Sequence, residues 1–254
     1  MRWNTRPQFF DVLRLRRAAL RYSSHGWEVM PGAWLAGDRF SCQRPGCPTV
    51  GCHPALERWE DAATCDARRV DEWWSSRPHA VLLATGRTVD VLEVPAYLGL
   101  RVLGLARLHG HVLGPDRLPV GGPLAVTPTG RWMFLVRPGD RLRPELAGMR
   151  DVLHHGAGSW VPAPPTRLPE GRVRWAVTPD ETHWRLPDSY AIQALLVDSI
   201  GAAAVHPTPP RARSPWPEPM AEPSSRPSPD SPAPAGPPAA PVVPRQASTS
   251  RRAA

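Results

Sequence analysis

The apolar residues of this chain concentrate in two short runs near its middle, residues 80–84 and 89–94. The first run is continuously apolar, which is typical of a strand buried on both faces. In the second run apolar and polar residues alternate, so Glu93 falls on one face of the strand and Asp90 on the opposite face. A tight turn over residues 85–87 separates the runs. Together they predict a buried β-hairpin that carries two carboxylates.

Apolar residues recur at helical spacing in four other segments. Asp66 and Asp188 stand where an N-cap would begin the second and the fourth of these segments, and Gly26 stands where the first would end. The arginines of the first segment lie largely outside its apolar stripe, so they form either a solvated helix face or a surface that faces phosphates. The predicted helices cover residues 8–25, 66–76, 97–109 and 188–203.

The remaining apolar stretches are short and predict strands. Residues 124–127 and 132–137 flank a turn, and residues 152–155 and 159–161 form a second such pair. Single strands are expected at residues 27–30 and 173–177. This order predicts an α+β fold, with a mostly antiparallel sheet flanked by helices, over residues 8–204.

The C-terminal segment has a different composition. Residues 207–254 hold nearly half of the chain's 34 prolines and hardly any large apolar residue. Such a segment cannot bury enough surface to offset its ordering entropy, so residues 205–254 are predicted to be a disordered tail. The sequence shows neither a secretory signal nor an apolar run long enough for a membrane span, which predicts a cytoplasmic protein without a membrane partner.

The formal net charge of the 254-residue chain is +8, and all of its 31 basic residues are arginines. A GC-rich coding bias explains the absence of lysine most simply. A basic balance nevertheless favours polyanionic partners, and the planar guanidinium group suits phosphate.

The four cysteines lie close together in the sequence, beside a histidine. Cys42, Cys47, Cys52 and His53 fall in a polar loop rich in proline and glycine, and Cys65 follows. Zinc takes four thiolate or imidazole ligands in a tetrahedron, and turns bring near neighbours round one ion. We therefore predict a structural zinc site formed by the first four residues. Because Cys52 and His53 are adjacent and cannot easily reach the same ion, Cys65 is the alternative ligand.

Six motifs, taken in order, resemble the N-terminal domain of bifunctional DNA primase/polymerases (prim-pol) in the archaeo-eukaryotic primase superfamily. They include Gly-Trp-x-Val-x-Pro, the Cys/His loop ending in His-Pro, the Ala-Thr-Gly turn, Thr-Pro-x-Gly-Arg and Ala-Pro-Pro-Thr. The resemblance extends over about residues 15–170. The matching segments are residues 26–31, 42–54, 63–74, 84–95, 127–131 and 163–166.

The resemblance implies an enzyme that makes and extends primers on a DNA template. Its carboxylates would hold two divalent metals, Mg²⁺ or Mn²⁺, and a histidine would contact the incoming nucleotide. In this sequence the carboxylate pair corresponds to Glu93 and Pro95, the histidine to Trp132, and the later acid to Leu153, two residues from Asp151. These replacements argue against catalysis.

Three functions stay open at this point. The chain is a primase/polymerase, a non-catalytic module that binds nucleic acid or nucleotides, or a protein–protein adaptor that acts through its proline-rich tail. DNA, nucleotides and replication proteins are the expected partners, with zinc as structural cofactor and Mg²⁺ or Mn²⁺ only for an active enzyme. The candidate residues are Glu93, Asp90 and Asp151 for catalysis; Arg87, Arg131, Trp132 and Arg137 for nucleotide or nucleic-acid binding; and Cys42, Cys47, Cys52 and His53 for zinc, with Cys65 as the alternative.

Overall fold

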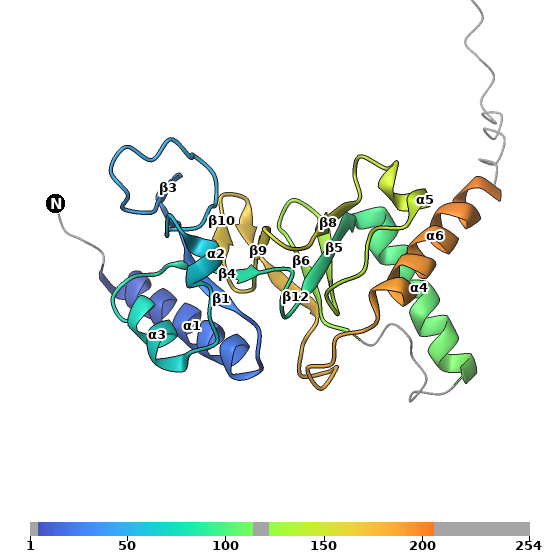
Figure 1. Cartoon of the computed structure of the whole chain (residues 1–254), viewed down its shortest axis with the longest axis horizontal. Coiled ribbons are helices and arrows are strands. Elements are labelled where there is room, and N and C mark those ends of the chain that lie inside the picture. Colours follow the sequence, from blue (N-terminus) through green and yellow to red (C-terminus); the bar gives the residue numbers. More distant parts are fainter. Residues whose placement is uncertain (1–4, 114–121, 206–254) are drawn as a thin grey trace, which may run out of the picture. The chain divides into compact units, whose positions relative to one another are not determined.

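Two antiparallel sheets organise the chain (Figure 1). The structure is a computed structural model and describes residues 5–113 and 122–205. The five-stranded sheet has the order β12 (Arg174–Val177), β6 (Leu124–Val126), β7 (Arg131–Val136), β5 (Asp90–Pro95) and β8 (Leu153–His155). The three-stranded sheet has the order β1 (Val29–Gly32), β4 (Ala80–Ala84) and β9 (Trp160–Pro162).

Short hairpins and six helices complete the described residues. The hairpins pair β2 (Trp34–Ala36) with β3 (Arg39–Ser41), and β10 (Arg167–Leu168) with β11 (Gly171–Arg172). The helices are α1 (Thr5–Ser24), α2 (Trp59–Ala62), α3 (Ala67–Trp73), α4 (Ala96–Leu113), α5 (Pro144–Ala147) and α6 (Ser189–Val205). This architecture confirms the predicted α+β class with antiparallel pairing.

The central prediction of a hairpin over residues 80–95 is wrong in its pairing. Both strands exist, but β4 pairs with β1 and β9, whereas β5 pairs with β7 and β8. The turn between them carries the chain from one sheet to the other. Gly86 makes this possible, because its φ is +101° and a Cβ there would lie 2.3 Å from the Cα of Ala157.

The predicted pair of strands at residues 152–161 is wrong for the same reason. The strand β8 joins the five-stranded sheet and β9 the three-stranded one. This second crossover runs beside the first. The amide of Thr85 donates to the carbonyl of Ser159 (3.0 Å), and the hydroxyl of Thr85 donates to the carbonyl of Gly156 (2.6 Å). Two neighbouring crossovers therefore tie the sheets together.

One face of the five-stranded sheet shares a hydrophobic core with the three-stranded sheet and α1. Val91 and Met133 face this core, together with Val81 of β4 and Leu15 and Tyr22 of α1. The helix α3 also packs against α1, and its N-cap is Asp66, whose carboxylate accepts from the amides of the first turn, as predicted.

The opposite face of the five-stranded sheet is covered by α4 and α6, which pack against each other (Figure 1). Leu92 and Phe134 face this second core, where they meet Leu98 of α4 and Leu196 of α6. The predicted tail, residues 205–254, lies outside the described residues except for Val205, the last residue of α6. No helix in the described ranges combines the length and the apolar character needed to cross a membrane.

Candidate functional site

Glu93 lies on β5 at the sheet face where the family resemblance places metal-binding acids, and both of its carboxylate oxygens have side-chain partners. The guanidinium of Arg131 donates from Nε to Oε1 (2.7 Å), and Nε2 of His155 lies 2.9 Å from Oε2. The side chain of Glu93 is 16% exposed and that of Arg131 is 24% exposed, so water has little access to the ion pair. Glu93 is thus bound within an ion-pair network.

Strand register explains why these three side chains meet. In the pairing of β5 with β7, Pro95 lies opposite Arg131, so Glu93 is its diagonal neighbour on the same face. In the pairing of β5 with β8, His155 lies opposite Val91, again on the face of Glu93. A long arginine side chain readily spans this diagonal.

The network also controls the ionisation of Glu93. Partial burial would raise the pKa of this carboxyl, but the hydrogen bonds and positive charges of His155 and Arg131 outweigh it and hold the pKa below its usual range. The Nη2 of Arg131 additionally donates to the main-chain carbonyls of Glu93 (3.3 Å) and Asp151 (2.8 Å). Arg131 therefore clamps β5 to the segment before β8.

Asp90 lies on the other face of β5, as the alternation predicted. It is 3% exposed, and its Oδ2 meets Nε2 of His154 (3.1 Å) and the amide of Gly139 (3.2 Å). Its Oδ1 is buried without a hydrogen-bond partner among the described atoms. The neighbouring side chains of His154 and His155 therefore point to opposite faces of the sheet, where His154 contacts Asp90 and His155 contacts Glu93.

The carboxylate of Asp151, the third candidate acid, contacts neither Glu93 nor Asp90 and neither of their histidine partners. Oδ2 of Asp151 accepts a hydrogen bond from the hydroxyl of Tyr97 (3.3 Å). Leu153 lies directly opposite Glu93 in the strand pairing, and Pro95 offers no ligand atom. The structure therefore does not bring Glu93, Asp90 and Asp151 around a common point.

The residues predicted to bind nucleic acid all have partners within the chain. Arg87 pairs with Glu28 (2.6 Å), and Arg137 pairs with Asp188 (2.8 Å). Trp132 is 9% exposed and packs against α4, where a Cβ at Gly99 would lie 2.5 Å from its ring. The ring lies in the core between the five-stranded sheet and the helices α4 and α6, so it is not available to stack on a base.

Three of the predicted zinc ligands do converge. The ligand atoms of Cys42, Cys47 and His53 lie within 4.8 Å of one another. Sγ of Cys47 and Nε2 of His53 are 3.4 Å apart, close to the separation of about 3.5 Å that tetrahedral Zn–S and Zn–N bonds imply. Nδ1 of His53 lies 2.7 Å from the carbonyl of Gly51, which fixes the ring and leaves Nε2 free to bind an ion.

Arg44 provides positive charge beside the two thiols. One of its guanidinium nitrogens lies 3.6 Å from Sγ of Cys47. Burial raises the pKa of Cys42, but hydrogen bonds from the main chain and guanidinium of Arg44 and from Cys47 outweigh it, so the net shift is downward. This arrangement favours the thiolate that metals bind.

The other two cysteines stand apart from this group. Cys52 packs against the apolar cluster around Met30 and Leu82, and burial raises its pKa to about 12. Burial also raises the pKa of Cys65, assisted by the negative charge of Glu28. Neither belongs to the set of side chains close enough to share an ion.

Sequence reasoning missed the partners of Glu93. It assigned Arg131 to phosphate and gave His155 no function. The adjacent His154 and His155 were the available signal, because an alternating strand must send them to opposite faces. The register that places one of them beside each acid depends on long-range pairing, which no local pattern encodes.

Comparison with protein families identifies a family whose model covers most of this chain. The model of the Prim-Pol family, described as "Bifunctional DNA primase/polymerase, N-terminal", matches residues 19–189, which is more than half of the chain. No curated protein matches the sequence. The matched range contains both sheets, the cysteine loop and the network around Glu93. The chain therefore belongs to the Prim-Pol family of bifunctional DNA primase/polymerase N-terminal domains.

Proposed function

We propose that this member of the family binds nucleic acid and does not perform two-metal nucleotidyl transfer. The observation that carries the proposal is the state of Glu93, whose two carboxylate oxygens are engaged by Arg131 and His155. A cation that approached this carboxylate would have to displace a guanidinium group already paired with it.

The side chains present do not fit a pair of divalent metals. Mg²⁺ and Mn²⁺ need several convergent oxygen ligands. Asp90 faces the helix side of the sheet, the carboxylate of Asp151 meets Tyr97, and Pro95 replaces the second acid. Within the described part of the chain, Cys42, Cys47 and His53 form the only group of three potential ligands close enough to share an ion.

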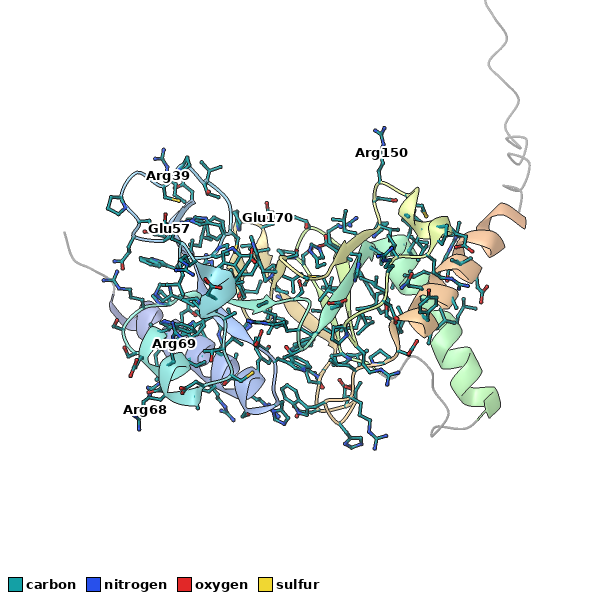
Figure 2. All side chains as sticks on the ribbon, in the orientation of Figure 1. Arg39, Glu57, Arg68, Arg69, Arg150 and Glu170 are labelled. Atoms are coloured by element: carbon teal, nitrogen blue, oxygen red, sulfur yellow. The ribbon has the colours of Figure 1, made fainter. Side chains whose placement is uncertain are left out.

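Nucleic-acid binding is supported by the family and by the surface charge. The formal charge of +8 comes entirely from an excess of arginine, whose guanidinium group binds phosphate through paired donors. Arg39, Arg68 and Arg150 project from the surface (Figure 2) and are exposed. Such side chains supply affinity without requiring a metal.

The test is equilibrium binding of a fluorescent single-stranded oligodeoxynucleotide, with and without added Mg²⁺ at constant ionic strength, over a series of salt concentrations. We expect the logarithm of the binding constant to fall linearly with the logarithm of the salt concentration, because phosphate contacts release counterions, and binding not to require Mg²⁺. Absence of binding at low salt, or binding insensitive to salt, would contradict the proposal.

We further propose that Cys42, Cys47 and His53 hold a structural zinc ion. Two sulfurs and one imidazole nitrogen are typical zinc ligands and supply three of the four positions of a tetrahedral site. The site would fasten the loop to the extension of β1, to which it is already tied by hydrogen bonds between Ala33 and His53 (2.8 Å) and between Ala55 and Pro31 (2.9 Å).

A further inference from the structure

A cavity of about 300 Å³ lies between α1 and the segment that follows β12, apart from the network of Glu93. Arginines of α1 line it together with aromatic side chains. Its principal lining residues are Arg14, Arg17, Arg21, Tyr22, Trp175 and Trp184. The volume is at the lower end of the range for small-ligand sites.

The α1 side of this cavity is cationic. Arg14, Arg17 and Arg21 are three and four residues apart, so they share one face of the helix. Arg14 pairs with Asp11 (2.8 Å) and Arg21 with Asp180. The exposed Arg17 has no hydrogen bond or ion pair with any described residue, so its guanidinium group is available to a ligand.

The opposite side is aromatic and held in place. The ring of Trp175 meets Tyr22 edge-on at 6.1 Å, and Nε1 of Trp184 donates to Asp180 (3.1 Å). His183 and Trp184 both adopt positive φ angles, 51° and 61°, a costly conformation for residues other than glycine. His25 stacks on one face of Trp184, with ring centroids 3.6 Å apart, and both indoles keep partly exposed surface.

We infer that this cavity binds one nucleotide unit, either free or within a single strand. Aromatic rings offer a face or an edge to a base, and an unpaired guanidinium beside them binds a phosphate, the combination that single-strand binding surfaces use. The inference rests on the proposed nucleic-acid binding and assigns it a location.

A proline-rich peptide is the competing occupant, since aromatic grooves also bind polyproline helices. The chain's own residues 208–254 are proline-rich, but they contain more arginine than aspartate and glutamate. A basic segment would be repelled by Arg17, whose charge has no carboxylate partner among the described residues. Charge complementarity therefore favours the anionic ligand.

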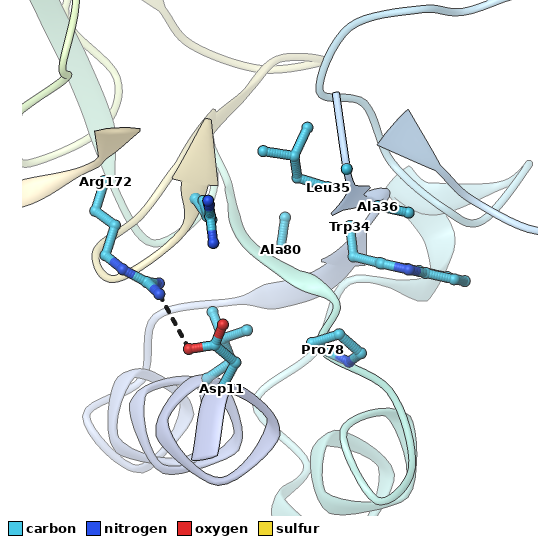
Figure 3. A pocket seen from close by; sticks show the side chains of 10 residues that line it. Asp11, Trp34, Leu35, Ala36, Pro78, Ala80 and Arg172 are labelled. Carbon is cyan, nitrogen blue, oxygen red and sulfur yellow. Dashed lines mark hydrogen bonds and ion pairs between the residues drawn. The ribbon is translucent and has the colours of Figure 1, made fainter. Parts of the chain in front are cut away.

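Arg17→Ala and the matched control Arg167→Ala test the inference. Arg167 is also exposed and lines a different cavity, of about 270 Å³, in which Asp11 pairs with Arg172 at 3.0 Å (Figure 3). Each variant removes one positive charge. The probe is a fluorescein-labelled oligodeoxythymidylate of about 12 nucleotides, within the usual range of single-strand site sizes.

For Arg17→Ala we expect weaker binding and a salt slope shallower by about 0.7, the value for one phosphate contact on a single strand. Arg167→Ala should keep the wild-type slope. Equal slopes for wild type and Arg17→Ala would overturn the inference while leaving the proposed function intact. Absence of binding by the wild-type protein would overturn both.

Photocrosslinking of an oligonucleotide containing 5-bromodeoxyuridine provides a readout that does not depend on a variant. We expect the crosslinked peptide to contain Trp175 or Trp184. Deoxythymidine monophosphate should compete if the cavity takes a free nucleotide, and only an oligonucleotide should compete if it takes a strand; both results support the inference. Crosslinks confined to other peptides, or displacement of the probe by a peptide of residues 207–219, would refute it.

Discussion

At the scale of single residues, the decisive feature is the ion pair of Glu93 with Arg131, at a position where the family resemblance implies a metal-binding acid. Glu93 keeps its carboxylate, but Arg131 forms an ion pair with one oxygen and the imidazole of His155 lies beside the other. The sequence alone predicted that Glu93 and Asp90 would face opposite sides of the strand, and their separate partners confirm it. It could not predict Arg131 as the partner, because that contact depends on the register of β5 against β7.

Removing one member of this pair should leave the other partly buried and unpaired. We expect Arg131→Met to lower the free energy of unfolding by about 1–3 kcal/mol, the usual cost of an unsatisfied buried polar group. Glu93→Gln, which keeps volume and hydrogen-bonding capacity, is the matched control and should cost less. Urea denaturation measures both values. An unchanged free energy of unfolding for Arg131→Met would show that the Glu93–Arg131 ion pair does not stabilise the fold.

The lowered pKa of Glu93 makes its contribution dependent on pH. A group with a depressed folded-state pKa stabilises the protein above its ordinary value of 4.5, and the contribution is lost as pH falls through the folded-state pKa. The stability difference between wild type and Glu93→Gln should therefore shrink as pH is lowered below about 4.5. Thermal unfolding at a series of pH values measures this difference, and a constant difference would contradict the assigned contacts.

At the scale of elements, the strands were largely predictable but their partners were not. The alternation in residues 89–94 identified β5, yet the assignment of β4 and β5 to one hairpin failed. Periodicity specifies which residues form a strand, whereas sheet membership follows from contacts remote in sequence, such as that of Thr85 with Ser159. The same limit applies to β8 and β9.

Glycines of α4 offer a matched test of how this helix packs on the sheet. A Cβ at Gly99 would lie 2.5 Å from the ring of Trp132, whereas a Cβ at Gly104 meets nothing within 4 Å. We expect Gly99→Ala to destabilise the protein by about 1–3 kcal/mol through overpacking. Gly104→Ala should stabilise it by about 0.5–1 kcal/mol through helix propensity. Thermal unfolding distinguishes the two, and a stabilising Gly99→Ala would contradict the packing of Trp132.

The cysteine loop allows an equally direct comparison. Cys47 is a proposed zinc ligand, whereas Cys52 belongs to an apolar cluster away from the other ligands. Protein purified without chelator should contain about one equivalent of zinc, and Cys47→Ser should lose most of it, because three- and four-ligand sites depend on each ligand. Cys52→Ser should retain the metal. Elemental analysis measures the content; zinc lost equally from both variants would contradict the assigned ligand set.

At the scale of the whole molecule, the chain belongs to the Prim-Pol family, and we propose that it lacks the family's two-metal chemistry. Ordered motifs in the sequence were sufficient to predict the family and the α+β class, since motif order follows the chain. They were not sufficient to predict the division into two sheets. That division depends on the two crossovers that meet at Gly86 and Ala157.

The central claim is that this scaffold lacks a working two-metal site. Template-directed incorporation of deoxynucleotides onto a primed and an unprimed single strand, with Mg²⁺ and with Mn²⁺, tests it most directly. We predict no incorporation above background by the wild-type protein, and no difference between it and Glu93→Gln. Incorporation by the wild type that Glu93→Gln abolishes would contradict the claim and show that Glu93 leaves Arg131 to bind metal.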